Sequence, residues 1–255
     1  MSIFNFKRFS VANEKSAMKV NTDGVLLGAW MDIHPDDRRL LDVGTGTGTI
    51  ALMAAQRLMD LVQGTSPEVP SAEGLNPVED VVIDAVEIDT DSAIEAGKNF
   101  SNSSWSDVLK VHNCTFSDFR PCGKYDLIFS NPPYFDSSLL APERRRCDAR
   151  HTSSGLSFRE LLEFASEYLS PMGRIAIVLP SDQENALCRY ARMCSLHLQR
   201  ILRVRTVPRK QPCRIIAEFS PVRPAQSQEV MFTIQNEGKY TEEYLSLTHD
   251  FYLFA

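Results

Sequence analysis

Four consecutive residues form the most specific chemical motif of the 255-residue chain: Asn131, Pro132, Pro133 and Tyr134. They directly follow residues 125–130, an apolar run that predicts a strand, and ligands of open α/β sheets bind beyond the carboxyl ends of strands. The Asn131 side-chain oxygen and the Pro132 carbonyl are two rigid acceptors for the two hydrogens of a planar amino group. Tyr134 can stack on the ring that carries the amine. The motif therefore predicts a site for an aromatic amine.

A glycine-rich segment, residues 42–48 (DVGTGTG), forms a second candidate site. It lies between a predicted strand and a predicted helix, where glycines let the backbone turn tightly and approach a ligand closely. The spacing is G-x-G-x-G and differs from the G-x-G-x-x-G of dinucleotide-binding folds. The candidate cofactor-binding residues of this segment are Asp42, Gly44, Thr45, Gly46 and Gly48.

An acidic residue, Glu87, lies near the end of the next predicted strand, residues 81–88 (VVIDAVEI). A carboxylate at such a strand end can accept hydrogen bonds from both hydroxyls of a ribose, and it usually lies about twenty residues after the glycines. Here the interval is roughly twice as long. Residues 63–80, rich in Pro, Gly, Ser and acid, predict a surface insertion that accounts for the excess.

Two basic tracts stand out in a chain whose net charge is −6. The acidic balance argues against non-specific coating of nucleic acid, but clustered arginines can still hold phosphates locally. The first tract contains Arg144, Arg145, Arg146 and Arg150. The second, residues 200–216, has no acid and contains Arg200, Arg203, Arg205, Arg209, Lys210 and Arg214.

The elements that position these residues alternate between strand and helix. The predicted strands are residues 39–43, 81–88, 108–114, 125–130 and 174–180, and the predicted helices are residues 50–61, 91–100, 158–169 and 185–193. This alternation predicts a parallel sheet with right-handed crossovers. Two late strands, residues 200–207 and 213–219, have no helix between them and predict an antiparallel hairpin. We expect one α/β domain spanning residues 1–255.

Composition excludes several classes of protein. The chain has no apolar run long enough to span a membrane and no secretory h-region. Its six cysteines form no C-x-x-C pair and no zinc-type cluster, which predicts reduced thiols, no metal site and a cytoplasmic location. Nothing in the sequence indicates an obligate protein partner.

Together these motifs resemble the class I S-adenosylmethionine-dependent methyltransferases, in particular those whose (N/D)-P-P-(Y/F) motif methylates amino nitrogens. The resemblance implies a Rossmann-like fold, a seven-stranded mixed sheet with one antiparallel strand, and helices on both faces. It also implies that Gly44, Gly46 and Gly48 lie under the methionine and ribose of S-adenosylmethionine, that Glu87 holds the ribose hydroxyls, and that Ile88 packs on the adenine.

After the third predicted strand, this family pattern places an acid beside an apolar residue near the cofactor's adenine amine. The matching pair here is Thr115–Phe116, so a threonine replaces the usual acid. Asp118 is close in sequence, but we interpret it as structural.

A narrower resemblance comes from the N-terminus. F-x-F-K-x-F at residues 4–9, followed by MKVNTDGVLLGAW at residues 18–30, is similar to the tRNA(Val) adenine-37 N6-methyltransferases. Ala149–Arg150–His151 and the basic residues 208–214 also fit that family. The likeness implies that residues 1–38 form an extension covering the cofactor site, with Lys19, Thr22 and Asp23 beside the cofactor. It implies tRNA as the partner, with RNA contacts from Arg145, Arg150, His151, Arg209 and Lys210.

The reaction implied is in-line transfer of an activated methyl group to an adenine N6 amine. That amine loses its proton only after attack, so no strong base is required, and no metal is implied.

Three alternatives remain at this stage. Another amino-methyltransferase would act on an rRNA or DNA base, or on protein glutamine. The glutamine enzymes usually carry a separate helical N-terminal domain, for which the residues before the first predicted strand are too few. A nicotinamide oxidoreductase would need the glycine spacing that the chain lacks. A non-catalytic RNA-binding relic would not need intact glycines, Glu87 and Asn131. Cofactor titration separates the three.

Overall fold

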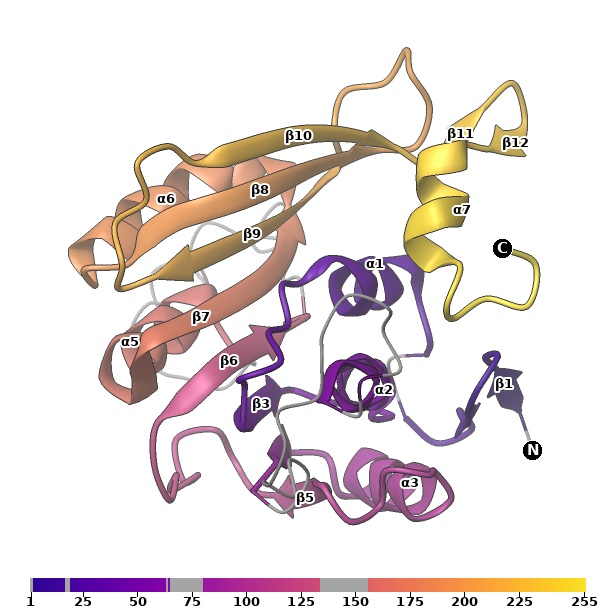
Figure 1. Ribbon diagram of the computed structural model, residues 1–255, viewed down its shortest axis with the longest axis vertical. Coiled ribbons are helices and arrows are strands. Elements are labelled where there is room, and N and C mark those ends of the chain that lie inside the picture. The colour runs from indigo at the N-terminus through magenta and orange to yellow at the C-terminus, as the bar shows by residue number, and fades with distance from the viewer. Residues whose placement is uncertain (1, 17–18, 63, 65–79, 134–155) are drawn as a thin grey trace, which may run out of the picture.

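A single eight-stranded sheet organises the chain, whose computed structural model describes residues 2–16, 19–62, 64, 80–133 and 156–255 (Figure 1). The strand order is β10-β8-β9-β7-β6-β3-β4-β5. In chain order these strands are β3 (Arg39–Val43), β4 (Val82–Glu87), β5 (Leu109–Asn113), β6 (Tyr125–Ser130), β7 (Leu169–Pro180), β8 (His197–Arg205), β9 (Arg214–Ser220) and β10 (Gln228–Thr233). Only β9 runs antiparallel to its neighbours in this sheet.

The predicted mixed sheet with one antiparallel strand is confirmed, but the count of seven strands is wrong. The eighth strand is β10, which pairs with β8 in parallel at the edge of the sheet. Its sequence, QEVMFT, has two polar residues at its start, and only its last two residues are buried. Because this edge strand faces solvent along most of its length, its sequence lacks the apolar run that marks the central strands.

Helices cover both faces of the sheet, as expected (Figure 1). On one face, α1 (Thr22–Trp30), α2 (Thr49–Val62) and α3 (Thr90–Ser101) share one apolar core. On the other face, α5 (Phe158–Tyr168) and α6 (Glu184–Met193) share a second core. A short 3-10 helix, η1 (Ser181–Gln183), leads into α6, and α7 (Glu242–Thr248) packs beside α1.

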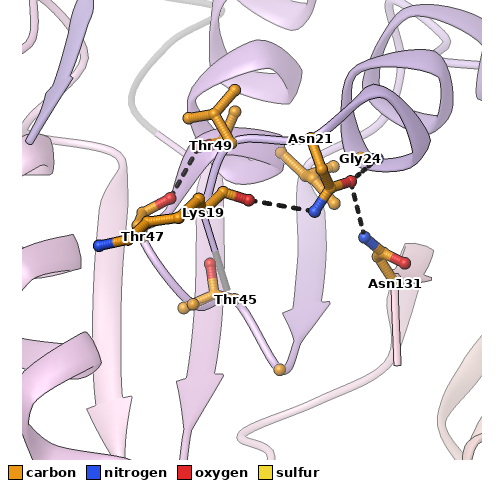
Figure 2. Close-up of a pocket in the computed structure, with 11 residues that line it drawn as sticks. Lys19, Asn21, Gly24, Thr45, Thr47, Thr49 and Asn131 are labelled. Carbon is orange, nitrogen blue, oxygen red and sulfur yellow. Dashed lines mark hydrogen bonds between the residues drawn. The ribbon is translucent and has the colours of Figure 1, made fainter. Parts of the chain in front are cut away.

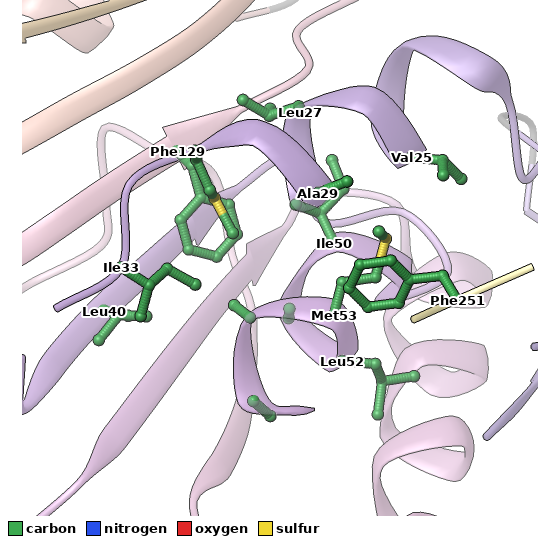
Figure 3. Packing of buried hydrophobic residues seen from close by; sticks show 14 of the residues in the cluster. Val25, Leu27, Ala29, Ile33, Leu40, Ile50, Leu52, Met53, Phe129 and Phe251 are labelled. Atoms are coloured by element: carbon green, nitrogen blue, oxygen red, sulfur yellow. The ribbon is translucent and has the colours of Figure 1, made fainter. Parts of the chain in front are cut away.

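Helix α1 was not predicted, and its burial explains why. Five of its nine residues are apolar and two are glycine, so it has no polar face to produce a helical period. It packs across α2, where Gly28 faces Met53 so closely that a Cβ would lie 2.7 Å from the Met53 sulfur. Figure 3 shows the resulting core, with Val25 and Leu27 of α1 above Ile50 and Leu52 of α2.

The first and last segments of the chain lie side by side. Strands β1 (Ile3–Asn5) and β2 (Ser10–Ala12) form a small hairpin, and the Lys7 amide donates to the Phe251 carbonyl at 2.8 Å. The Phe6 ring stacks on Tyr252 with centroids 6.0 Å apart. A second small hairpin, β11 (Gln235–Asn236) with β12 (Lys239–Tyr240), precedes α7. In the described residues no helix is long and apolar enough to cross a membrane.

Candidate functional site

An open pocket lies where β3 and β6 end, at the edge where ligands of α/β sheets bind. The space within it, open mouth included, is ≈ 350 Å³. Three separate segments line it (Figure 2). The lining residues are Lys19, Val20, Asn21 and Gly24, then Gly44, Thr45, Gly46, Thr47, Thr49 and Ile50, and finally Asn131. Three residues of the predicted glycine segment, Gly44, Thr45 and Gly46, therefore share one pocket with Asn131, whereas Asp42 and Gly48 lie outside its lining.

The three glycines of the loop have different tasks. All have positive φ (+74° at Gly44, +57° at Gly46 and +81° at Gly48), a conformation that strains other residues. Gly44 and Gly46 line the pocket, so their backbone can approach a ligand. At Gly48 a Cβ would lie 2.4 Å from a carbon of the Phe100 ring, so this glycine lets α3 pack against the loop.

Asp42 is fully buried at the start of the loop. One carboxyl oxygen accepts a 2.7 Å hydrogen bond from the Thr45 hydroxyl, and the other makes no hydrogen bond within the described residues. Burial raises the pKa of Asp42 to about 7. Interactions with the Thr45 hydroxyl and the Ala51 backbone amide oppose that rise, and the Glu87 charge adds to it. Asp42 is thus a buried acid whose hydrogen-bonding capacity is only partly used.

Glu87 ties the glycine loop to the end of β4. Its two carboxylate oxygens accept from the backbone amides of Gly46 and Asp89, each at 2.8 Å. A carboxylate has about four acceptor positions, so these two amides use about half of them. The next residue, Ile88, is apolar and 68% exposed. Neither Glu87 nor Ile88 is among the residues that line the pocket.

The Thr115–Phe116 pair lies after β5, outside the set of residues that line the pocket. The Thr115 hydroxyl donates to Asp118 at 2.7 Å, and the Asp118 amide donates back to it. The Phe116 ring packs against Phe164 with centroids 4.8 Å apart. Asp118 therefore closes a turn with Thr115 at the end of β5.

The segment before α1, which we call the strap (residues 12–16 and 19–21), contributes Lys19, Val20 and Asn21 to the pocket wall. Glu95 of α3 holds it, accepting from the amides of Glu14 at 2.7 Å, Lys15 at 3.2 Å and Ser16 at 3.0 Å. The Lys19 ammonium closes the strap by donating to two carbonyls, those of Asn13 and Glu14.

Asn99, one turn after Glu95 on α3, joins the strap to the glycine loop. Its side-chain amide donates to the carbonyls of Ala12 (3.1 Å) and Thr47 (2.8 Å), and its oxygen accepts from the Ala12 amide at 2.8 Å. The strap and the loop are therefore fixed to one helix.

The first residues of α1 complete the wall. Asn21 is the N-cap, and its side-chain oxygen accepts from the Gly24 amide at 2.8 Å. Thr22 and Asp23 form the first turn, and Asp23 is paired with Arg214 of β9 at 2.7 Å. Neither of these two residues lines the pocket.

Asn131 projects into the pocket from the end of β6 (Figure 2). Its side chain is nearly buried, and its amide nitrogen lies 3.4 Å from the side-chain oxygen of Asn21. The preceding residue, Ser130, donates to the Val43 carbonyl at 2.7 Å and so holds the end of β6 beside the glycine loop. Pro132 is buried and Pro133 is exposed, whereas Tyr134 lies outside the described residues.

Sequence reasoning missed part of this pocket. Val20, Asn21, Gly24, Thr47, Thr49 and Ile50 line it but were not predicted as site residues. For Asn21 a signal existed, because asparagine before an acidic first turn is a typical helix N-cap.

The second basic tract is largely occupied by internal contacts, which corrects its interpretation as a phosphate-binding surface. Arg200 pairs with Glu218 at 2.8 Å and stacks on the Trp30 ring. Arg203 pairs with Glu184 and Glu229. Arg205 donates to Thr233 and to the Pro208 carbonyl, and Arg214 pairs with Asp23.

Two predicted RNA contacts of that tract, Arg209 and Lys210, are exposed in the loop between β8 and β9. Arg145, Arg150 and His151 lie outside the described residues, as does nearly all of the predicted 63–80 insertion. Within the described part of the chain, no three His, Cys, Asp or Glu side chains are grouped to hold a metal.

Comparison with known proteins gives a consistent result. The profile of the family described as RMKL-like, methyltransferase domain, matches residues 32–193. A relative from Parabacteroides distasonis is 40% identical over 253 residues, which is 98% of this chain and 97% of the relative. One from Trichodesmium erythraeum is 39% identical over the same shares of the two chains. Both are named tRNA1(Val) (adenine(37)-N6)-methyltransferase.

Solved structures with the same fold are more distant in sequence. A predicted O-methyltransferase from Agrobacterium tumefaciens superposes with a TM-score of 0.61 at 14% identity, over 90% of this chain and 96% of the other. A methyltransferase from Pyrococcus furiosus gives a TM-score of 0.54 at 19% identity, over 84% and 89%. These likenesses establish the methyltransferase fold.

Proposed function

The chain belongs to the family of tRNA1(Val) (adenine(37)-N6)-methyltransferases, and from this premise we propose that it methylates N6 of adenine 37 in the anticodon loop of tRNA(Val), with S-adenosylmethionine as methyl donor. One observation carries the proposal: Asn131 and the glycine loop line the same pocket. The loop would hold the cofactor next to Asn131, the residue that would hold the amine.

The donor set fits the proposed cofactor. Gly44 and Gly46 leave room above the loop, Glu87 has acceptor positions for ribose hydroxyls, and the exposed Ile88 offers an apolar surface for the adenine. Asp42 has a buried oxygen with no hydrogen bond within the described residues. The bound cofactor supplies a methyl group already activated on a sulfonium sulfur.

We further propose that the strap belongs to the cofactor site, with Lys19 in its wall and Thr22 and Asp23 at the start of α1 behind it. On this view residues 1–38 are an extension that covers the site within one methyltransferase domain of residues 1–255. Thr115 and Phe116 are assigned to the adenine end of the cofactor, beyond the pocket's described lining.

The residues after β6 perform the substrate chemistry. The Asn131 oxygen and the Pro132 carbonyl accept the two N6 hydrogens, which draws the nitrogen lone pair out of conjugation and toward the methyl group. Pro133 keeps this segment rigid, and Tyr134 stacks on the adenine ring. The amine would take the methyl group as the bond from methyl to sulfur breaks, and would then release its proton to water, so the site needs only position and charge complementarity.

The anticodon loop suits this site because its bases are unpaired, and splaying out one base costs little. We assign phosphate contacts to Arg209 and Lys210 in the β8–β9 loop, and to Arg145, Arg150 and His151. With tRNA as substrate, we propose that the chain acts in the cytoplasm.

A substrate panel tests the proposal. The purified protein is titrated with S-adenosylmethionine by calorimetry and then assayed on a tRNA(Val) transcript, an rRNA fragment, duplex DNA and a glutamine peptide. We expect saturable cofactor binding and methyl transfer to the tRNA alone. Methyl transfer to another member of the panel would support the methyltransferase activity but refute tRNA(Val) as the substrate. A protein that does not bind the cofactor would refute both proposals.

A further inference from the structure

We propose that Asn21 is a positioning residue that sets which end of the Asn131 side-chain amide faces the substrate. The effect of this orientation on catalysis rests on the proposed function, because only the oxygen of the Asn131 amide can accept a hydrogen bond from an amine. Three hydrogen bonds support this proposal. Two join Asn21 to backbone groups, and the third joins Asn21 to Asn131 (Figure 2).

Backbone groups leave Asn21 with a single orientation. Its side-chain nitrogen donates to the Lys19 carbonyl at 3.1 Å, and a carbonyl can only accept. Its side-chain oxygen accepts from the Gly24 amide at 2.8 Å, and an amide N–H can only donate. In a flipped Asn21, the side-chain oxygen would face the Lys19 carbonyl, and the side-chain nitrogen would face the Gly24 amide. Neither pair can form a hydrogen bond, so the backbone determines the direction of this amide.

The fixed Asn21 oxygen then selects the direction of Asn131. That oxygen can only accept, so the atom of Asn131 that faces it at 3.4 Å must be the donating nitrogen. A reversed Asn131 would bring two oxygens together with no proton between them at a nearly buried position. The Asn131 oxygen is therefore directed to the opposite side of its amide group, where it can accept from the substrate amine.

The surroundings make this selection possible. Gly24 lies against both side chains: a Cβ there would be 3.5 Å from the Asn21 oxygen and 3.6 Å from the Asn131 nitrogen. Because Asn21 is the N-cap of the buried helix α1, its position is fixed by the core rather than by solvent contacts. The arrangement of Asn21 and Asn131 is thus set by the fold and is present before substrate binds.

Two substitutions separate orientation from capping. Asn21→Ser keeps an N-cap hydroxyl but shortens the side chain, so contact with Asn131 is lost while α1 remains capped. Asn21→Asp keeps an oxygen that accepts from both Gly24 and Asn131. It loses the donor to the Lys19 carbonyl, which should lower Tm while the contact with Asn131 stays in place. A control for capping alone is Thr241→Ala, which removes the N-cap bond of α7; that helix packs beside α1, but Thr241 itself lies outside the pocket lining.

Steady-state kinetics with S-adenosylmethionine and tRNA(Val) give the first readout. We expect Asn21→Ser to lower kcat about tenfold with KM for S-adenosylmethionine and Tm little changed. Asn21→Asp should keep kcat within about threefold of wild type, and Thr241→Ala should leave kcat unchanged. A wild-type kcat in Asn21→Ser, or a loss that follows Tm alone, would overturn the inference.

A second readout does not depend on turnover. In protein labelled with ¹⁵N-asparagine, the Asn131 side-chain amide signal is assigned by its absence in Asn131→Ala. Its shift and proton exchange should change in Asn21→Ser and stay near wild type in Asn21→Asp. Unchanged signals in Asn21→Ser would overturn the inference even if kcat fell. An inactive wild type would refute the proposed function instead, and the spectra would still decide the orientation.

Discussion

The burial of Asp42 at the start of the glycine loop favours its protonated form. Burial raises the pKa of this carboxyl group to about 7 in the folded chain, well above its ordinary value of 3.8. The folded state therefore binds the proton more tightly than the unfolded state, and stability falls as pH rises from about 4 through 7.

Asp42→Asn should remove this dependence, because an amide does not ionise. Between pH 5 and 8 we expect the wild type to lose about 2–3 kcal/mol of unfolding free energy relative to the variant. Urea unfolding of both proteins at several pH values measures the difference. Parallel stability profiles for the two proteins would show that Asp42 does not titrate in this range.

At the residue scale, sequence was sufficient where a motif is continuous. Gly44, Gly46 and Asn131, which line the pocket, were predicted because each belongs to a short motif that directly follows a predicted strand. Thr47, Thr49 and Asn21 were missed because their role depends on where the strap and the loop meet. Arg203 was misinterpreted for the same reason: its two acidic partners, Glu184 and Glu229, are distant in sequence.

At the scale of elements, helix α3 organises the cofactor side of the pocket. Glu95 accepts three backbone amides of the strap. Burial alone would raise the pKa of Glu95, but those hydrogen bonds and the Lys19 charge outweigh it, so the net pKa is below its ordinary value. The hold that Glu95 has on the strap is therefore complete near neutral pH and weakens as acid protonates the carboxylate.

Glu95→Gln should loosen the strap, because its amide group has one accepting oxygen where the carboxylate has two. We expect the Kd for S-adenosylmethionine to rise about tenfold, as for the loss of one charge-assisted hydrogen bond. Calorimetric titration of wild type and variant measures this change.

The matched control is Asp91→Asn on the same helix. Asp91 pairs with Lys15 of the same strap at 3.5 Å, but both side chains are 62% exposed, and exposed pairs contribute little. Equal cofactor affinity for wild type and Glu95→Gln, or an equal loss in both variants, would contradict the assigned role of Glu95.

The elements show what periodicity can and cannot predict. Strands β3, β4, β5, β6 and β9 and the helices α2, α3, α5 and α6 were predicted to within one or two residues, since their apolar patterns are strong. Strand β8 begins at His197, three residues before the prediction. Strand β7 begins at Leu169, five residues before the prediction, because its first residues include the polar and turn-forming S-P-M-G run. Helix α1 escaped prediction because a helix buried on nearly every side has no amphipathic pattern.

On the scale of the whole molecule, residues from the two end segments of the chain pack into the same apolar core. The Phe251 ring is 2% exposed and lies beside Met53 and Ile50 in the core shared by α1 and α2 (Figure 3). Lys7 adds a link by donating to the carbonyls of His249 and Ala255.

Phe251→Ala should leave a cavity under α1 and lower stability by about 3–5 kcal/mol. Chemical unfolding measures the loss. Leu253→Ala is the control, since Leu253 is 67% exposed and its loss should change stability by less than about 0.5 kcal/mol. A small effect of Phe251→Ala would show that the C-terminal segment is not part of the core.

Charge at the molecular scale limits where an RNA can bind. Most arginines of the second basic tract are paired with acids, so Arg209 and Lys210 are its exposed cations in the β8–β9 loop.

Replacing both Arg209 and Lys210 with alanine should weaken tRNA binding and reduce its salt dependence by about two phosphate contacts, with cofactor affinity unchanged. Binding measured over a range of salt concentrations tests this, with exposed Arg223→Ala as the control. An unchanged salt slope in the double variant would place the RNA elsewhere.

The most direct test of the account is methyl transfer to a defined nucleotide. Wild-type protein and Asn131→Ala are incubated with labelled S-adenosylmethionine and unmodified tRNA(Val), in parallel with a transcript that carries guanine at position 37, and the products are digested to nucleosides. The account predicts label in N6-methyladenosine for the wild type, a loss of about 10²-fold or more in Asn131→Ala, and no label without adenine 37. Label in another nucleoside, or full activity in Asn131→Ala, would contradict it.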